Sequence, residues 1–267
     1  MLNSMTVLNL MALATLVPAA FVGVRGKQAP DATLWLAIAV AFFGSTLWVV
    51  VSFMPSWRTD FGAALWVTAS VTLGLFIAVA LTHADAWRLT PVLAPVVLLI
   101  GIMATIWTGH EAARPLSEGP GMLVAAHIAV SVATYGLVTI AAVAALAALL
   151  QERALKTKRP GRLSHALPPV TACDKLMVRT LVAGECVLAV GLLSGMALSY
   201  AETGSLLAVD HKTLLTITAF VLIAIWLWVH FRSGLRGRKA ARWALAAYLL
   251  LTLGYPGVKF VTDVLLD

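Results

Sequence analysis

This chain of 267 residues is strongly apolar, since 61% of its residues are hydrophobic, 12% are charged and the mean hydropathy is +0.93. A soluble domain does not need so much apolar sequence, so the composition excludes a soluble globular protein and indicates a membrane protein. The net charge of +7 does not indicate nucleic-acid binding, because the basic residues lie in short connections between apolar runs. The two cysteines, Cys173 and Cys186, form neither a disulfide framework nor a CxxC pair.

The apolar runs predict an all-α fold, a polytopic bundle of about eight transmembrane helices that makes a single domain over residues 1–267. Each run has about 20 residues or more, the length that crosses a hydrocarbon layer. The first run has no basic residue before Arg25, which predicts a retained anchor and not a cleaved signal peptide. In chain order the runs cover residues 4–24, 31–53, 61–82, 89–108, 121–150, 177–200, 212–231 and 242–262.

Two segments rich in Lys and Arg set the predicted orientation. Residues 151–179 hold seven of these cations and residues 232–242 hold five. The positive-inside rule places both segments in the cytoplasm. Threading the other spans around them places the connections 109–120 and 201–211, and both termini, in the periplasm of a bacterial inner membrane. The mixed apolar and basic segment from Val170 to Arg179 is predicted as a short interfacial helix.

The six histidines are the informative polar residues, because a polar side chain at membrane depth is costly and is usually kept for a function. The predicted topology places His83, His165 and His230 on the cytoplasmic side, and His110, His127 and His211 on the outer side.

His127 and His211 begin two different predicted helices, so both can point into one half-buried outer pocket. Histidines from two helices are what six-coordinate haem iron takes as axial ligands. Lys212 or Arg114 could then pair with the haem propionates.

Other interpretations of these residues stay open. Each histidine could be a headgroup-level residue with a hydrogen bond and no metal, and a zinc site is less favoured because HExxH and close Cys/His spacing are absent. Glu185, inside an apolar run, indicates either a structural hydrogen bond or the proton relay of a proton-coupled transporter. Small-residue runs and basic loops also fit a cofactor-free accessory or regulatory subunit of another membrane protein, such as an ion-efflux system. The roles of Glu185, His110 and His230 are not decided by the sequence.

Part of the chain resembles a known family. The run GPGMLVAAHI from Gly119 to Ile128, continuing to Tyr135, resembles the helix entrance of the cytochrome c assembly membrane proteins, the haem-handling superfamily of CcsA, CcmC and HemX, and within it the YpjD-like branch. Five further motifs extend the similarity over most of residues 119–267, whereas residues 1–118 match only in length and hydropathy. These motifs are Leu167-Pro168-Pro169, Leu192-Leu193-Ser194-Gly195, Asp210-His211-Lys212-Thr213, Gly234-Leu235-Arg236-Gly237-Arg238 and Gly254-Tyr255-Pro256-Gly257-Val258-Lys259.

In that superfamily, two outward-facing histidines flank a tryptophan-rich segment and ligate haem. The resemblance therefore implies that His127 and His211 are the axial ligands of a b-type haem, in a non-enzymatic protein of cytochrome c biogenesis or haem transport. The chain departs from the family at residues 200–210, which contain no tryptophan. Because an aromatic shelf supplies stacking area for an exposed porphyrin, this departure argues against delivery of haem to apocytochrome. The expected partners are membrane lipid, haem, and another membrane protein of cytochrome assembly or ion efflux.

Overall fold

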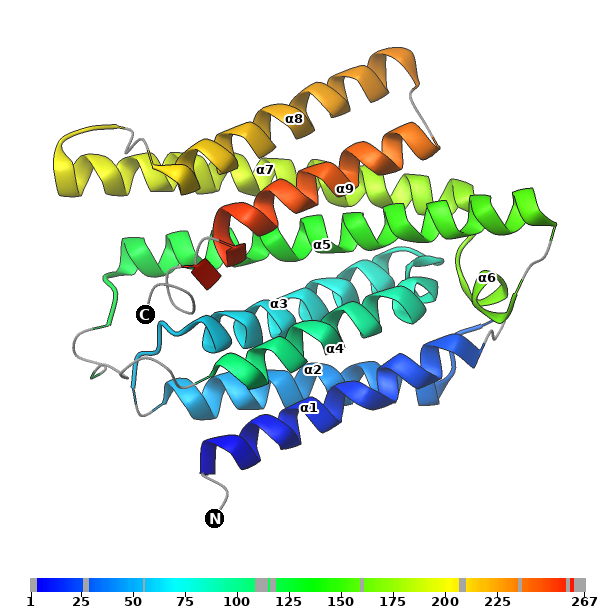
Figure 1. Cartoon of the computed structure of the whole chain (residues 1–267), viewed down its shortest axis with the longest axis horizontal. Coiled ribbons are helices and arrows are strands. Elements are labelled where there is room, and N and C mark those ends of the chain that lie inside the picture. The colour runs from blue at the N-terminus through cyan, green and yellow to red at the C-terminus, as the bar shows by residue number, and fades with distance from the viewer. Residues whose placement is uncertain are drawn as a thin grey trace.

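A computed structural model shows the chain as a bundle of long helices lying side by side (Figure 1). It describes residues 4–25, 29–54, 56–108, 115, 119–158, 161–206, 210–234, 237–257 and 260–261. The helices are α1 (Ser4–Val22), α2 (Ala32–Phe53), α3 (Phe61–Thr82), α4 (Thr90–Trp107), α5 (Met122–Thr157), α6 (Arg162–Ala166), α7 (Val170–Thr203), α8 (His211–Ser233) and α9 (Arg238–Thr252). Short 3₁₀ turns cover Gly23–Arg25 and Ala86–Leu89.

Seven of the described helices are long and apolar enough to cross a membrane. The eighth predicted span corresponds to α9, which has 15 residues and is prolonged by a π-helical turn over Leu253–Gly257. This segment contacts both α5 and α8, so it belongs to the bundle. The predicted all-α membrane bundle is therefore confirmed, whereas the periplasmic location of the termini stays a prediction.

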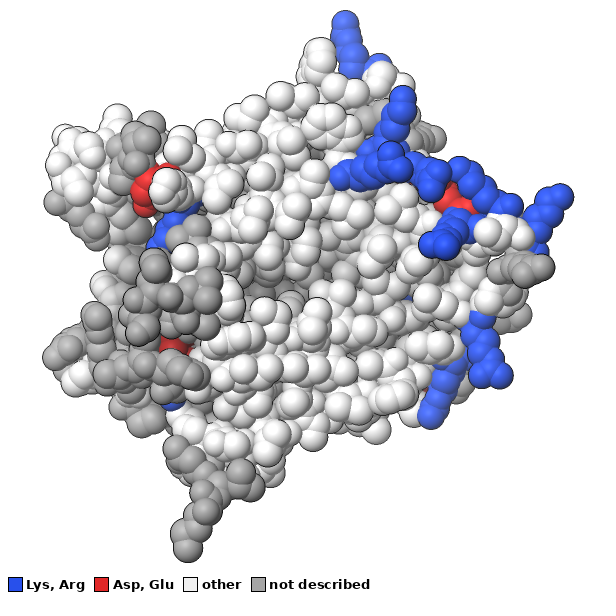
Figure 2. Space-filling model, in the orientation of Figure 1, with Lys and Arg blue, Asp and Glu red and all other residues white. Residues whose placement is uncertain are grey.

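The bundle has two chemically different ends. We call the end at which α5 and α8 begin the His127 end, and the end at which they finish and α9 begins the basic end (Figure 1). Figure 2 shows Lys and Arg side chains gathered at the basic end, while the long sides of the bundle carry almost no charge on the face in view. An uncharged band beside a cationic end is the surface that a lipid bilayer requires of a spanning bundle.

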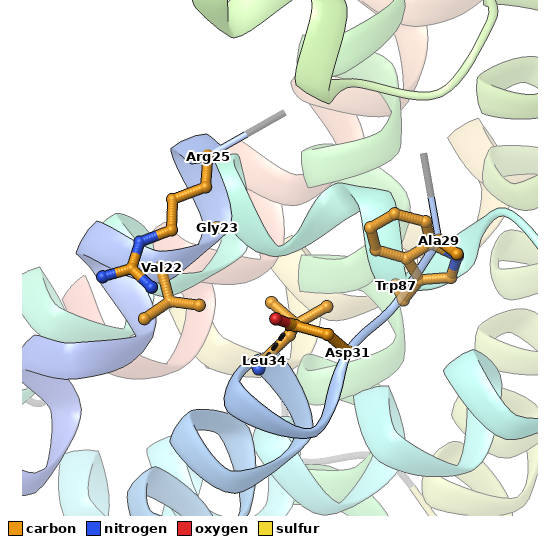
Figure 3. A pocket seen from close by; sticks show the side chains of 7 residues that line it. All are labelled: Val22, Gly23, Arg25, Ala29, Asp31, Leu34 and Trp87. Atoms are coloured by element: carbon orange, nitrogen blue, oxygen red, sulfur yellow. Dashed lines mark hydrogen bonds between the residues drawn. The ribbon is translucent and has the colours of Figure 1, made fainter. Parts of the chain in front are cut away.

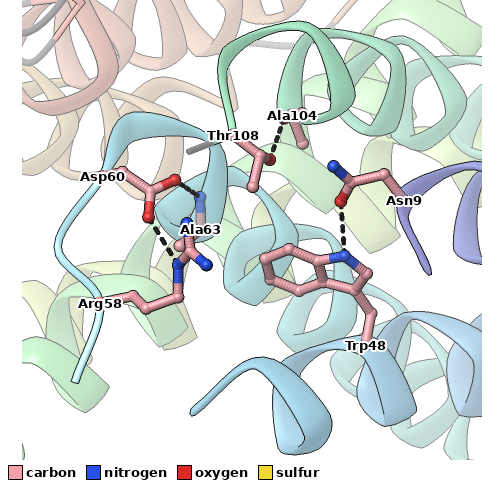
Figure 4. Close-up of polar contacts among 7 residues, drawn as sticks. All are labelled: Asn9, Trp48, Arg58, Asp60, Ala63, Ala104 and Thr108. Atoms are coloured by element: carbon pink, nitrogen blue, oxygen red, sulfur yellow. Dashed lines mark hydrogen bonds and ion pairs between the residues drawn. The ribbon is translucent and has the colours of Figure 1, made fainter. Parts of the chain in front are cut away.

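Helices α1–α4 form the first half of the molecule, in which α1 contacts α2 and α4, and α3 contacts α2 and α4. At its centre Trp48 stacks on Trp66 with ring centroids 5.3 Å apart, and the Trp48 indole N–H donates to the Asn9 side-chain oxygen at 2.6 Å. Figure 4 shows this contact and, nearby, the buried ion pair in which Arg58 Nε donates to Asp60 at 2.9 Å. Asp60 also caps α3 by accepting from the backbone N–H of Ala63, so one carboxylate fixes both the loop and the helix start.

Helices α5, α7, α8 and α9 form the second half, in which α5 contacts α7 and α9, and α8 contacts α7 and α9. The close approach of α5 and α7 depends on glycines of α7. A Cβ added at Gly184 would lie 3.1 Å from Val138 Cγ2, and one added at Gly191 would lie 3.5 Å from Val130 Cγ1. Small residues bring helix backbones together where lipid gives no hydrophobic drive.

Three kinds of contact join the halves. At the His127 end, Phe260 lies 5.7 Å from the Phe61 ring and 5.3 Å from the Trp107 ring. In the middle, α5 meets α3 at Gly136, where an added Cβ would lie 2.9 Å from Leu75 Cδ1. At the basic end, Arg88 donates to the carbonyl oxygens of His165 and Ala166 at 2.8 and 3.2 Å, which ties α6 to the first half. Helix α5 is thus shared by the two halves (Figure 1).

One predicted element differs from the structure. The segment from Val170 to Arg179 is not a separate interfacial helix but the first part of α7, which continues without a break to Thr203. Cys173, Leu176 and Met177 are buried within it, so this segment packs in the bundle. No glycine or proline lies between Val170 and Ala183 to interrupt the helix.

Candidate functional site

His127 lies in the second turn of α5, half-buried against α7. Its Nδ1 is 2.8 Å from Ser194 Oγ, and that hydroxyl donates to the carbonyl oxygen of Gly191 at 2.9 Å. Because the Ser194 proton is used on the carbonyl, its oxygen is left to accept, which favours a proton on Nδ1. Nε2 then carries the lone pair. This is the arrangement of a metal-binding histidine, in which the nitrogen that does not bind the metal donates a hydrogen bond.

Gly195 leaves the space that the His127 ring occupies. A Cβ at this position would lie 3.1 Å from His127 Cε1 and 3.9 Å from Nε2. A side chain here would therefore press on Cε1, the ring atom between the two nitrogens. Ser194 orients the imidazole and Gly195 makes room for the ring, so consecutive residues of α7 shape one niche for a residue of α5.

Apolar side chains surround this end of the three helices. Leu123 is one turn before His127 on α5, Leu193 precedes Ser194 on α7, and Leu214 follows His211 by three residues on α8. All three are exposed in the chain. They offer the kind of surface that a flat apolar macrocycle takes.

His211 is the first residue of α8 and is exposed, and so is Lys212. Asp210 caps this helix, because its carboxylate accepts from the backbone N–H of Thr213 at 2.7 Å. That hydrogen bond lowers the pKa of Asp210 below its ordinary value, and the nearby Lys212 and His211 add to the effect. The cap fixes where α8 begins and hence where His211 and Lys212 leave the backbone.

The structure brings the predicted residues only partly together. His127, His211 and Lys212 are all at the His127 end, but among the described residues no hydrogen bond joins His127 to His211, and His127 faces α7. The pairing of the two histidines therefore stays a prediction. Arg114 and His110 lie outside the described residues. Within the described ranges no three His, Cys, Asp or Glu side chains come together as a metal-binding group, so nothing there favours the zinc alternative.

The remaining described histidines have other contacts at the basic end. His83 Nδ1 lies 2.9 Å from Thr82 Oγ1, and the His165 carbonyl accepts from Arg88. His230 stacks on Trp226 with ring centroids 5.4 Å apart. These contacts fit a structural part for each residue.

Glu185 lies in the middle of α7. Both of its carboxyl oxygens are buried, and neither has a hydrogen-bond partner among the described residues. A carboxylate anion without a donor at this depth would cost several kcal/mol. Within the described ranges, Glu185 thus has no hydrogen-bond partner of the kind that the sequence suggested.

A small pocket opens at the basic end of the first half (Figure 3). Val22, Gly23, Leu34 and Trp87 are among the residues that line it. Asp31, which also lines it, uses its carboxylate to cap α2 at the backbone N–H of Leu34. Of the predicted site residues, the described ones, His127, His211 and Lys212, do not line this pocket, so it is separate from them.

The sequence did not identify the parts played by Gly191, Ser194 and Gly195. Ser194 and Gly195 lie in a motif that carried the family resemblance, and Gly191 directly precedes it, yet small residues in an apolar span are typical of helix packing. Their spacing of three and four residues places them on one face of α7. This spacing is the sequence feature that could have pointed to them. The sequence alone could not show that His127 meets this face.

Comparison with known proteins supports the resemblance. A family model described as cytochrome C assembly protein matches residues 36–266. The chain is 48% identical, over 97% of its length and 98% of the relative, to an uncharacterized 28.8 kDa protein in the nifR3-like 5' region of Azospirillum brasilense. It is 29% identical to the inner membrane protein YpjD of Escherichia coli K12, over 67% of this chain and 66% of that protein. It is 25% identical to protein HemX of Bacillus subtilis 168, over 50% of this chain and 48% of that protein. No solved structure matches the chain.

Proposed function

We propose that this chain, which belongs to the cytochrome C assembly protein family, binds haem in the bacterial inner membrane through His127. The observation that carries the proposal is the engaged Nδ1 of His127, which leaves the lone pair on Nε2, in a ring that Ser194 and Gly195 hold in place. Membership of the family supports a haem-related membrane function. The name of the Escherichia coli relative supports the location in the inner membrane.

The residues at the His127 end fit the chemistry of haem. His127 supplies one axial ligand, and His211 is the second candidate because it is exposed at the start of α8. Lys212 offers an exposed cation for a propionate, and Arg114 is proposed for the same part from the sequence alone. The role is binding or handling of haem and not enzymatic catalysis. The segment at residues 200–210, without tryptophan, supports retention or passage of haem over its presentation to apocytochrome.

An absorption spectrum of the purified protein tests the proposal. Protein in detergent should take up haemin and, once reduced, show the sharp Soret and alpha bands of a low-spin six-coordinate haem. His127→Ala should lose these bands, and the double variant with His211→Ala should stay colourless. His83→Ala is the matched control, since it removes a histidine at the basic end and should keep the spectrum.

The single variant His211→Ala separates the two ligands. If His211 binds the iron, this variant should retain haem with a high-spin spectrum, because one axial position is lost. A low-spin spectrum unchanged in His211→Ala would remove His211 from the proposal but leave His127. A wild-type protein that takes up no haemin would contradict the whole proposal. It would favour the cofactor-free accessory subunit, which a stoichiometric membrane partner in the purified sample would support.

Glu185 favours a second function, proton-linked transport. Its carboxyl group is buried and has no hydrogen-bond partner in the described part of the chain, and a membrane proton relay needs such a group. In proteoliposomes, Glu185→Gln should abolish proton-driven uptake while leaving assembly intact. The same rate in wild type and Glu185→Gln would exclude this function, whatever the haem spectrum shows.

A further inference from the structure

The two halves differ sharply in charge at the basic end. The two segments of the first half at this end, residues 23–31 and 83–90, hold three Lys or Arg and two Asp. The two segments of the second half, residues 151–179 and 232–242, hold twelve Lys or Arg and two acidic residues. Both halves cross the same membrane, so orientation alone does not account for the excess in the second half.

The cations of the second half come from several helices and lie on the surface. The described and exposed ones are Arg153 and Lys156 on α5, Lys158 directly after α5, Arg162 on α6, Lys175 and Arg179 on α7, Arg232 on α8, and Arg238, Lys239 and Arg242 on α9. We call these ten residues the inner basic surface. Figure 2 shows Lys and Arg side chains gathered at this end of the molecule, with few acidic side chains between them. In the first half, by contrast, Arg88 is used on backbone carbonyls.

Glu152 lies at the junction of α5 with the turn between α8 and α9. Its Oε2 is 3.9 Å from Arg238 Nε, and a Cβ at Gly237 would lie 3.0 Å from its Oε1. The carboxylate therefore lies between the end of α5 and the start of α9, two helices that contact each other, so the cations of both are close together. One carboxylate offsets only a small part of their charge, and the surplus is left to an external anion.

Apolar and aromatic side chains lie directly below these cations on the same helices. Trp228 and Phe231 on α8 are 67% and 69% exposed, and Trp243 on α9 is 43% exposed. Trp228 and Trp243 are each about five residues from the helix end, or about 7 Å along the axis, which is the level of the headgroups and glycerol. A ligand here meets cations at one end and apolar surface at the other.

We propose that the inner basic surface is a binding site for anionic glycerophospholipids, with the phosphodiester group on the cations of α5, α8 and α9. The acyl chains then lie along the exposed faces of α8 and α9. A soluble acidic protein or free phosphate would match the cations but not the aromatic and apolar surface below them. This site is independent of the haem proposal, because it uses residues at the opposite end of the bundle.

The test measures binding of phosphatidylglycerol to the full chain in detergent, by native mass spectrometry and by the shift of the melting temperature. Phosphatidylglycerol should bind and raise the melting temperature, and phosphatidylcholine should do neither. The triple variant Arg238→Gln, Lys239→Gln, Arg242→Gln should lose affinity by more than about tenfold, since each cation near a membrane surface contributes about fivefold. Raising NaCl should weaken the wild-type interaction.

Two control variants test whether the loss of lipid binding is specific to the charges of the inner basic surface. Arg238→Lys with Arg242→Lys keeps the charges and should bind as the wild type does, and Arg25→Gln removes a cation of the first half and should also bind normally. The proposal is overturned if phosphatidylcholine binds equally, if the triple variant binds phosphatidylglycerol like the wild type, or if inorganic phosphate displaces the lipid. It is also overturned if an acidic protein copurifies and blocks the binding of phosphatidylglycerol. A normal haem spectrum in the triple variant would show that the two proposals stand apart.

Discussion

In the first half of the bundle, the buried Trp48 indole and the Arg58 guanidinium find partners within the half itself. Trp48 donates to Asn9, and Arg58 pairs with Asp60. In the second half, His127 is held through one ring nitrogen while the other is left free, and most of the cations at the basic end have no carboxylate beside them in the sequence. This contrast supports the proposal that ligands bind to the second half, with the first half as its scaffold.

The largest expected effect is on the stability of the first half, at the crossing of α1 and α2. A Cβ at Gly44 would lie 2.6 Å from the Cβ of Thr15, so Gly44→Leu forces the two helices apart. Overpacking of this kind costs about 3 kcal/mol, which corresponds to a melting temperature lower by about 6–12 °C. Thermal unfolding in detergent measures the effect. Gly161→Leu, where nothing lies within 4 Å of an added Cβ, is the control and should melt like the wild type.

The same variant challenges the division into two halves. If the halves are separate in function, folded Gly44→Leu protein should keep its haem spectrum at temperatures below its melting transition. A haem spectrum lost at low temperature, with the fold intact, would contradict the assignment of binding to the second half alone.

A smaller effect is expected at the residue that orients His127. Ser194→Ala removes the hydrogen bond to Nδ1, so the ring is no longer held with Nε2 outward. Loss of such a partner lowers metal-site affinity by about tenfold or more. Haemin titration followed in the Soret band measures it. Ser199→Ala, on the same helix but bonded to the Ser205 carbonyl, should leave the affinity unchanged; equal affinity in Ser194→Ala would show that Ser194 has no orienting role.

The smallest effect is expected at the cap of α8. Asp210→Ala removes the acceptor for the Thr213 N–H and should lower the free energy of unfolding by about 1 kcal/mol. Because the pKa of Asp210 is lowered in the folded protein, its charge stabilises the fold above the ordinary aspartate pKa of about 4 and this contribution is lost as the pH falls further. Asp210→Asn keeps an acceptor without the charge.

Melting curves recorded between about pH 3 and about pH 7, on both sides of the ordinary aspartate pKa, compare these variants. The difference between the wild type and Asp210→Asn should shrink toward the acid end. A difference that is the same at both ends would assign the stabilisation to something other than the Asp210 charge.

The sequence predicted the helices well and their partners poorly. Spans of about 20 apolar residues are a local property, so the eight spans were recoverable, and the basic segments were visible as such. The contacts between helices, by contrast, are not a local property of the sequence. The niche formed by Ser194 and Gly195 for His127 depends on how α5 meets α7, and the continuity of α7 through Val170 depends on burial against the bundle. The position of His211 was predicted, but its distance from His127 depends on the tilt of α8, which periodicity does not fix.

The place of α5 between the halves also bears on how the protein is made. Helices α1–α4 precede it in the chain and contact one another, so their mutual contacts can form while the rest is still being synthesised. Helix α5 then docks on α3 at Gly136 and presents its other side to helices that emerge later. The second half is thus assembled on a finished template, and His127 gains its hydrogen-bond partner only when α7 arrives with Ser194. The niche that Ser194 and Gly195 form for His127 is therefore among the last parts of the structure to form during synthesis.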